Sequence, residues 1–332
     1  MIPYTERDTD LALRPPYQME GVEACLAIRG IKWSVAQAWV NKTLNWRPEG
    51  APAAPFFVAF PLAFVTFMRI RSMRSLDPDF LKWGTFSESE MHVTLMLCKY
   101  GADGLPDLLN PSFYPVVLCV DSSPALIAGR ESFGFPKIFG EVEISPHRCE
   151  ARTEVLATLG DPCVRKRASL VTLARIGASP ADTPAEENIA FRKALSEMVS
   201  EKNCRETAAD FEPFPWSRIW SDLSPKNVLE RIPAIFAALL PDHAEFVFLR
   251  QFRSTENARV ASLREVVGSK VTFENLTQVR RETGDWFLEV PDHHSSSLLT
   301  ELGITSGPIP APLRANFGFH LPLGETLWSS HP

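Results

Sequence analysis

The sequence predicts an α+β fold made mainly of antiparallel strands, with the sheet closed or strongly curved into a barrel and helices at its periphery. Two observations predict this class. The 332 residues include 28 prolines against 17 glycines, which disfavours long helices and favours short elements joined by turns. Short runs of strand-forming residues also follow one another along most of the chain, without the regular alternation with helices that a parallel sheet requires.

The expected elements begin with residues 1–30, an arm that leads into a first short element, and continue with a short helix over Trp33–Leu44. In that helix Val35, Trp39 and Val40 lie on one side, as the helical period requires. Runs rich in β-forming residues and separated by turn signals are expected to form strands at 56–70, 91–98, 114–120, 139–144, 150–158, 165–175, 245–250, 260–267, 271–274 and 286–290.

A helical region at about 177–243 is expected to interrupt these strands. Thr183-Pro184-Ala185-Glu186 has the form of a capping box with proline at the first helical position, and predicts a helix that runs to about Glu201. A second helical stretch is expected from Ser224 to the neighbourhood of Pro233, which kinks or ends it.

The uncharged segment 51–68 is long enough to be compared with a transmembrane helix. Pro52, Pro55 and Pro61 interrupt it, and its many phenylalanine and valine residues favour strands. Arg69 and Arg71 then flank Ile70, as in a strand that leaves a core. The segment therefore predicts a buried strand pair rather than a membrane span.

Composition and charge narrow the possible functions. With 34 Lys and Arg against 40 Asp and Glu, the net charge of −6 disfavours binding to nucleic acid, which requires a basic face. The six cysteines form no CxxC pair, and the N-terminus has neither the basic nor the apolar region of a signal peptide, so we expect a cytoplasmic protein with reduced thiols and no membrane contact. No glycine-rich phosphate loop and no His/Cys group with ligand spacing is visible, so no cofactor and no metal are expected.

Lys137 stands in an apolar segment that predicts chemistry. The run 132–140 reads Ser-Phe-Gly-Phe-Pro-Lys-Ile-Phe-Gly, so Phe133, Phe135 and Phe139 all lie within four positions of the lysine. Burial in such surroundings disfavours the ammonium and favours the neutral amine, which is the form that attacks a carbonyl carbon. The alternative is a lysine whose stem lies on an apolar strand and whose ammonium reaches solvent.

The longer run from Tyr114 to Lys137 resembles the acetoacetate decarboxylase family. It contains a Pro-Ala pair after a strand (124–125), a Gly-Arg-Glu triplet (129–131) and, after two more residues, Gly-Phe-Pro-Lys (134–137), without a gap. The resemblance is sharp over 114–140 and looser over 15–175 and 244–325. It implies a single domain over 1–332 with the barrel of that family, a Schiff base on Lys137, and a homo-oligomer. The helical insertion at about 177–243 is longer than the family needs.

The same resemblance suggests further site residues. Phe86-Ser87-Glu88 is similar to the family's aromatic-X-Glu, whose carboxylate lies in the active-site cavity. Glu90 is the competing choice for the cavity carboxylate, because it lies on the same face as Glu88 if the strand is regular. The alternative to both is that Ser-Glu-Ser-Glu forms a solvated loop. Arg130 and Glu131 are expected to form an ion pair that supports the lysine turn, while Phe133, Phe135 and Phe139 are expected to exclude water. His92 is interpreted as a strand histidine rather than a base.

Three departures from the family leave the reaction open. Ile138 stands where the bacterial decarboxylases have a second lysine, Met68 lies near the position of a second cavity glutamate, and only Arg29 lies near the expected N-terminal arginine. The sequence therefore predicts a lyase that acts on a carbonyl-containing organic acid through a lysine Schiff base, with β-keto acid decarboxylation as the first hypothesis. The alternatives are an aldolase or dehydratase of the same superfamily, and a non-enzymatic barrel that binds an apolar ligand.

Overall fold

The computed structural model describes residues 12–48, 56–99, 111–155, 169–178, 243–291 and 297–330. The helical insertion predicted at about 177–243 lies outside these residues except at its ends. Within them, no helix is both long and apolar enough to cross a membrane.

The described elements are mainly strands. The strands are β1 (Tyr17–Gly30), β2 (Phe57–Ser75), β3 (Phe86–Cys98), β4 (Ser112–Val120), β5 (Lys137–Ile144), β6 (Arg148–Val155), β7 (Ser169–Ala178), β8 (His243–Arg253), β9 (Ala261–Arg281), β10 (Trp286–Glu289), β11 (Gly307–Ile309), β12 (Leu313–Leu321) and β13 (Glu325–Ser329). The helices are α1 (Trp33–Thr43), α2 (Ser123–Ser132), α7 (Ser297–Glu301) and a 3₁₀ turn at Leu81–Trp83. The predicted mainly β class is confirmed.

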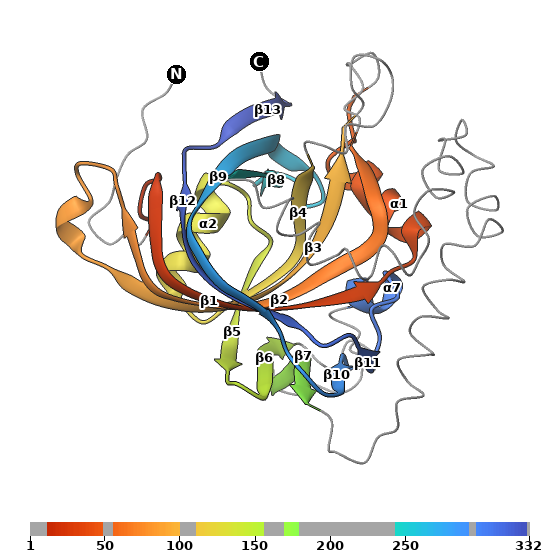
Figure 1. Ribbon diagram of the computed structural model, residues 1–332. Helices are drawn as coiled ribbons and strands as arrows, with labels where there is room; N and C mark the ends of the chain where they lie inside the picture. The colour runs from red at the N-terminus through yellow and green to blue at the C-terminus, as the bar shows by residue number, and fades with distance from the viewer. Residues whose placement is uncertain are drawn as a thin grey trace.

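Seven of these strands close into a ring (Figure 1). The pairing runs β4-β3-β2-β1-β12-β9, and β8 closes the ring because it pairs with both β9 and β4. Neighbouring strands in the ring are antiparallel except at β4–β8, where a short parallel contact joins Ser112–Phe113 to Glu245–Phe246. The predicted antiparallel, strongly curved sheet is thus observed as a ring of strands.

A second group of strands extends from the ring at β4. β5 pairs with β4 in parallel over residues 137–139, and the pairing then continues through β6, β7, β10 and β11. These strands lie to one side of the ring, below it in Figure 1. The first residue of β5 is Lys137, so the lysine lies where the second group of strands leaves the ring.

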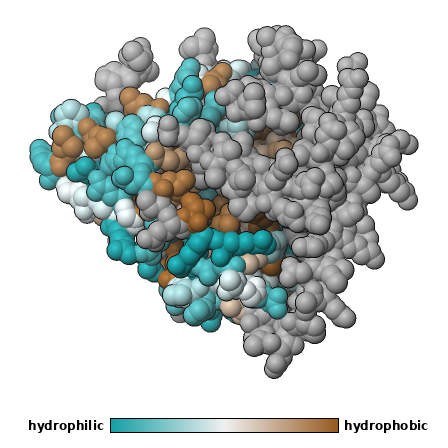
Figure 2. Space-filling model, viewed as in Figure 1, coloured by the Kyte–Doolittle hydropathy of each residue, from teal (hydrophilic) through white to brown (hydrophobic). Residues whose placement is uncertain are grey.

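The alternation of side chains along the ring strands separates the apolar residues inside the ring from those on its outer face. Met91 and Val93 of β3 belong to a large cluster that includes buried residues of α1 and of the second group of strands. Residues of the opposite parity point into the ring, where Tyr17, Ile70, Phe133 and others form a second cluster. In the view of Figure 2, apolar residues gather near the middle of the face, between hydrophilic side chains. The ring interior is therefore a separate apolar compartment.

Helix α1 is the predicted helix at Trp33–Leu44, and polar side chains fix it to β2. The Trp33 Nε1–H donates to the Val58 carbonyl at 2.8 Å. The buried Gln37 amide accepts from the Val58 N–H at 2.9 Å and donates to the Phe56 carbonyl at 3.2 Å.

Several elements differ from the sequence-based prediction. The expected arm over residues 1–30 contains β1, a strand of 14 residues. The described part of the strand pair expected at 51–68 belongs to the single strand β2 of 19 residues. The runs 260–267 and 271–274 belong to one strand, β9. Helix α2 and strands β11 to β13 have no counterpart in the prediction. The helices expected over 183–201 and from Ser224 lie outside the described residues.

Candidate active site

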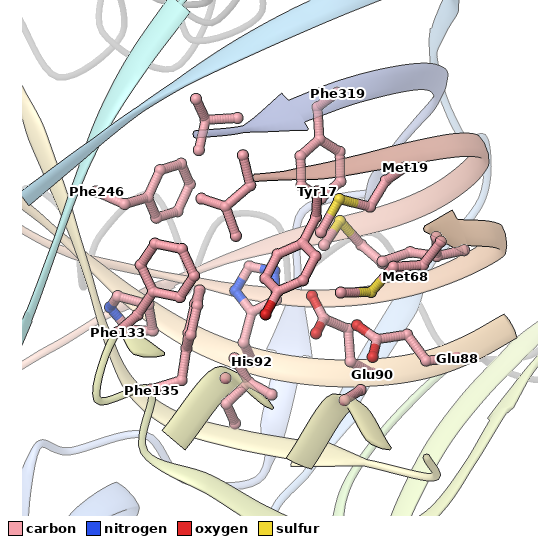
Figure 3. A pocket seen from close by; sticks show the side chains of 18 of the residues that line it. Tyr17, Met19, Met68, Glu88, Glu90, His92, Phe133, Phe135, Phe246 and Phe319 are labelled. Carbon is pink, nitrogen blue, oxygen red and sulfur yellow. The ribbon is translucent and has the colours of Figure 1, made fainter. Parts of the chain in front are cut away.

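A cavity of about 90 Å³ lies inside the ring, with walls that are mostly apolar. Its lining comes from seven ring strands together with α2 and the start of β5. The polar or ionisable side chains in its wall are those of Tyr17, Glu88, Glu90, His92 and Lys137. Figure 3 shows Tyr17, Glu88, Glu90 and His92 directed toward a common space, with Phe133 and Phe135 beside them.

Lys137 is placed by a helix followed by a tight turn. Ser122 caps α2, since its hydroxyl accepts from the Ala125 N–H, and the Gly129 carbonyl accepts from the N–H groups of Phe133, Gly134 and Phe135 at the other end. Gly134 has a φ of +85°, and a Cβ there would lie 2.4 Å from the Cα of Arg250, so only glycine fits. This turn returns the chain to α2 and directs Lys137 into the ring.

The lysine side chain packs directly on Gly129. A Cβ added at Gly129 would lie 3.0 Å from both Cδ and Cε of Lys137 and 3.3 Å from its Nζ. The glycine of the Gly-Arg-Glu triplet therefore leaves the space that the lysine occupies. The Lys137 side chain is 6 % exposed, so the surface-reaching alternative considered for it does not hold.

Two carboxyl groups face the lysine amine. The Nζ of Lys137 lies 3.7 Å from Oε1 of Glu88 and 3.9 Å from Oε2 of Glu90. Both glutamates belong to β3, two residues apart and therefore on one face, and they are 3 % and 6 % exposed. The structure thus brings together both glutamates that the sequence left as competing choices, and neither lies in a solvated loop.

Burial raises the pKa of both carboxyls in spite of the nearby lysine. The pKa of Glu88 rises to about 8 because desolvation, the first cause, outweighs the attraction of Lys137, and the charge of Glu90 adds to the rise. The pKa of Glu90 is also raised, because burial outweighs the opposing effects of the Lys137 charge and of a hydrogen bond from Glu88. Glu88 is therefore the protonated partner at neutral pH, and it donates to Glu90.

One oxygen of this pair has no partner. Oε2 of Glu88 is buried and makes no hydrogen bond within the described part of the chain. Leaving a buried polar atom unsatisfied is unfavourable, so such an atom in a cavity wall is a natural contact for a bound molecule.

His92 also lines the cavity, and the sequence analysis, which interpreted it as a strand histidine rather than a base, did not place it in the site. It lies two residues beyond Glu90 on the same face of β3, and its Nδ1 is 2.8 Å from the Thr94 hydroxyl oxygen. Burial, and then the charge of Lys137, lowers its pKa from 6.5 to about 4, so the imidazole is neutral at pH 7. The shared parity of residues 88, 90 and 92 was the signal that could have found it.

Tyr17 is a second such residue, contributed by β1. Its hydroxyl donates to the Leu13 carbonyl, and its ring centroid lies 6.2 Å from that of Phe133. Burial raises the pKa of its phenol, with a smaller contribution in the same direction from the charge of Glu88. No local pattern in the sequence connects this tyrosine with the lysine turn.

Two of the three predicted phenylalanines line the cavity and one does not. The rings of Phe133 and Phe135 are 5.7 Å apart, and Nζ of Lys137 lies 5.3 Å from the centroid of Phe135. The prediction for Phe139 is wrong, because its side chain is 55 % exposed and lies outside the cavity wall. At residue 139 the strand β5 ends its pairing with β4 and turns to β6, so the alternation that would place Phe139 beside Lys137 is lost.

Arg130 contacts the main chain of Lys137 with its side chain, and the main chain of Glu131 contacts the side chain of Arg250. Arg130 is exposed, and its Nη1 lies 3.5 Å from the Lys137 carbonyl oxygen. The Glu131 carbonyl accepts from Nε of Arg250 at 2.6 Å, and Arg250 also pairs with Glu265 at 2.7 Å. The expected support of the turn by these two residues stays a prediction, as does their ion pair.

Of the three positions that depart from the family pattern, residue 68 lines the cavity and residues 29 and 138 do not. Met68 lines the cavity and pairs in register with Glu90, so the neighbouring strand supplies the carboxyl that position 68 lacks. Arg29 donates to the Pro308 carbonyl at 2.8 Å, away from the cavity wall, and Ile138 is exposed. Among the described residues, no three His, Cys, Asp or Glu side chains are grouped so that they could hold a metal ion.

The fold and the site together define a class, a mainly β protein whose ring of strands encloses a buried lysine next to two carboxyl groups. Residues 52–170 match the family described as acetoacetate decarboxylase (ADC), which confirms the resemblance noted for residues 114–137. A comparison with curated proteins found no match.

Solved structures support the same fold. The crystal structure of acetoacetate decarboxylase from Legionella pneumophila subsp. pneumophila str. Philadelphia 1 is similar over 99 % of this chain and 93 % of its own, with a TM-score of 0.53 and 12 % identity. An acetoacetate decarboxylase-like enzyme from Sphingomonas wittichii RW1 covers 97 % and 96 %, with a TM-score of 0.52 and 13 % identity. The enduracididine biosynthesis enzyme MppR, complexed with pyruvate, covers 97 % and 93 %, with a TM-score of 0.53 and 12 % identity. At these identities the similarity establishes an acetoacetate decarboxylase-like fold.

Proposed function

We propose that the protein is a lyase that acts on a carbonyl-containing organic acid through a Schiff base on Lys137, and that its reaction is the decarboxylation of a β-keto acid. The observation that supports this most directly is the position of the Lys137 amine, 3.7 Å and 3.9 Å from two carboxyl groups inside an apolar cavity. A buried amine beside proton donors and acceptors is the arrangement that imine chemistry requires.

Imine formation uses both carboxyl groups. Attack requires a free electron pair on Nζ, so the proton of the Lys137 ammonium passes to the Glu90 carboxylate. Nζ then bonds to the carbonyl carbon and passes one of its protons to the oxygen, and the protonated Glu88 supplies the second proton, so that the oxygen leaves as water and a protonated imine remains. The pKa of Glu88, raised to about 8, supports its role as the proton donor.

Decarboxylation follows from the charge on the imine. The electrons of the bond between the α-carbon and the carboxylate move toward the iminium nitrogen, carbon dioxide leaves, and an enamine remains. The α-carbon then takes a proton from Glu90, and hydrolysis releases the ketone and the lysine. Phe133 and Phe135 exclude water from the cavity, which strengthens the electrostatic contacts within it.

The substrate carboxylate would meet few charged groups in this cavity. Lys137 supplies the cation in its wall, whereas Arg29, the arginine nearest to the family position, contacts the main chain elsewhere. Decarboxylation removes the carboxylate charge from this apolar space, so the surroundings favour the products over the bound acid.

An aldol or dehydration reaction is the second candidate. Glu90 and His92 supply more acid–base groups beside the amine than the loss of carbon dioxide needs, and the structurally similar MppR is complexed with pyruvate. The two candidates differ in their products. Carbon dioxide released from a β-keto acid supports decarboxylation, whereas condensation or dehydration of a 2-oxo acid without carbon dioxide release supports the second candidate.

Reductive trapping tests the shared first step. The protein is incubated with acetoacetate and borohydride, and the modified peptide is located by mass spectrometry. We expect a stable adduct on Lys137, no adduct there in Lys137→Met, and an unchanged adduct in Lys270→Met, a matched change at an exposed lysine of β9. A folded protein that gives no adduct with any keto acid of a C4 to C8 series would overturn the proposal and favour a protein that only binds ligands. A Lys137→Met variant that releases carbon dioxide at the wild-type rate would overturn the role of Lys137 in the reaction.

A further inference from the structure

A second cavity lies beside the first inside the ring. It measures about 130 Å³, and its lining side chains come from the seven ring strands. Nearly all of them are apolar; the polar groups in its wall are Thr66, Thr94 and His92. None of the mechanistic steps above uses this space.

The two cavities are separated by side chains rather than by main chain. His92, Phe246, Phe273 and Phe317 line both of them. Each of these side chains is only partly buried, so each has free space beside it. A change in side-chain rotamer would join the two cavities without any movement of the strands.

The second cavity has the size and surface to hold an aromatic ring. An apolar cavity of about 150 Å³ is known to accept a benzene molecule, and this one is only slightly smaller. Its wall contains several phenylalanines in edge or tilted contact, with centroids 5.6 Å apart for Phe113 and Phe246 and 5.6 Å apart for Phe273 and Phe317. Such clusters accept a further ring in the same geometry.

Thr66 gives an independent indication of a ligand. Its side chain is 4 % exposed, and its hydroxyl has no hydrogen-bond partner among the residues that the structure describes. The neighbouring Thr94 hydroxyl is already engaged by His92. An unpartnered hydroxyl in an apolar chamber is unfavourable, whereas the face of an aromatic ring provides it with a weak acceptor.

We propose that this second cavity, the tail cavity, binds an aromatic group of the substrate, so that the protein acts on β-keto acids whose carbonyl carbon carries an arylalkyl tail. The inference rests on the proposed function for the identity of the first cavity. The carbonyl carbon lies at Lys137, the carboxylate stays in the first cavity, and the tail passes between His92 and the aromatic rings of the shared wall into the second. Acetoacetate occupies the first cavity alone.

A substrate series with a cavity-filling variant tests the inference. The decarboxylation of acetoacetate, 3-oxo-4-phenylbutanoate and 4-cyclohexyl-3-oxobutanoate is compared in the wild type and in Ala315→Leu, which fills the tail cavity from β12. Ala261→Leu makes the same change at an exposed position and serves as the control. We expect the phenyl substrate to exceed acetoacetate in kcat/KM by at least about tenfold and the cyclohexyl substrate by less, and Ala315→Leu to remove the advantage while leaving acetoacetate unchanged.

A binding measurement separates this inference from the proposed function. 4-Phenylbutanoate has the tail and the carboxylate but no ketone, and its binding is measured by calorimetry in the wild type, Lys137→Met and Ala315→Leu. Binding to the first two, weakened about tenfold in Ala315→Leu, supports the tail cavity even if no imine forms. Decarboxylation of acetoacetate without any preference for the phenyl substrate, and without binding of 4-phenylbutanoate, overturns the tail cavity and leaves the proposed function intact. Equal rates with the phenyl and cyclohexyl substrates overturn the aromatic preference.

Discussion

We expect the Gly129→Ala variant to form the Lys137 imine about five- to tenfold more slowly than the wild type while remaining fully folded, because a displacement of about 1 Å in an active site can cost a factor of about 100. The added Cβ would lie 3.0 Å from Cδ and Cε of Lys137. Ordinary contact begins at 3.4 Å, so the side chain has to retreat by about 0.4 Å, which accounts for the smaller factor.

Stability and activity should change in opposite directions in this variant. Gly129 lies inside α2 without a positive φ, so alanine fits the main chain, and replacing glycine in a helix gains about 1 kcal/mol before the contact with Lys137 is counted. Thermal unfolding should therefore show a melting temperature that is unchanged or higher, because the flexible lysine side chain can absorb the contact.

The rate is measured by trapping the imine with borohydride in a single turnover, and Gly177→Ala is the matched control. A Cβ at Gly177 meets its nearest neighbour, the carbonyl oxygen of His147, at 3.8 Å, so that variant should trap the imine at the wild-type rate. A Gly129→Ala variant that reacts as fast as Gly177→Ala would refute the reasoning, since the position of the lysine would then not limit the reaction.

Three further variants test other parts of the structure. Glu88→Gln should lower kcat by at least about 100-fold because an amide cannot transfer the proton. The folded pKa of Glu88, about 8, exceeds the ordinary 4.5, so the free energy of unfolding of the wild type should fall as the pH rises from 4.5 to 8. Urea unfolding should show that Glu88→Gln lacks this loss. Phe139→Ser should change stability by no more than about 0.5 kcal/mol and leave kcat/KM unchanged, since the ring is exposed; a large loss of activity would return Phe139 to the site. Gln37→Leu should lower the free energy of unfolding by about 1–3 kcal/mol, because the Val58 N–H loses its partner while the Phe56 carbonyl keeps the Asn45 amide; urea unfolding with an unchanged midpoint would contradict this.

Elements with a continuous local pattern could be predicted from the sequence, and interrupted ones could not. The period of α1 is uniform, and the helix was found. The register of β1 shifts between Met19 and Val22, next to Gly21 with a φ of +64°, so its alternation changes phase and no strand was recognised. Helix α2 was missed because its buried side consists of small residues, Ala125, Ala128 and Gly129, which give no apolar stripe.

The site residues that a local pattern marks could also be predicted from the sequence, and those brought in by long-range pairing could not. Lys137 was identified from one contiguous run of sequence, and Glu88 and Glu90 follow from the parity of one strand. Tyr17 reaches the cavity only because β1 pairs with both β2 and β12, a long-range arrangement that local residues do not encode. Phe139 was misplaced because β5 changes partner strands at that residue.

The acid–base groups of the cavity share a single segment of main chain. Glu88, Glu90 and His92 occupy alternate positions of β3, whereas the amine that they serve arrives from a separate turn. Deleting or inserting one residue in β3 would rotate all three out of the ring together and bring Ser87, Ser89 and Met91 inward, while Lys137 kept its place. The three candidate acid–base side chains therefore depend on the register of one strand, so a single substitution would change one of them, whereas a change in the length of β3 would displace all three.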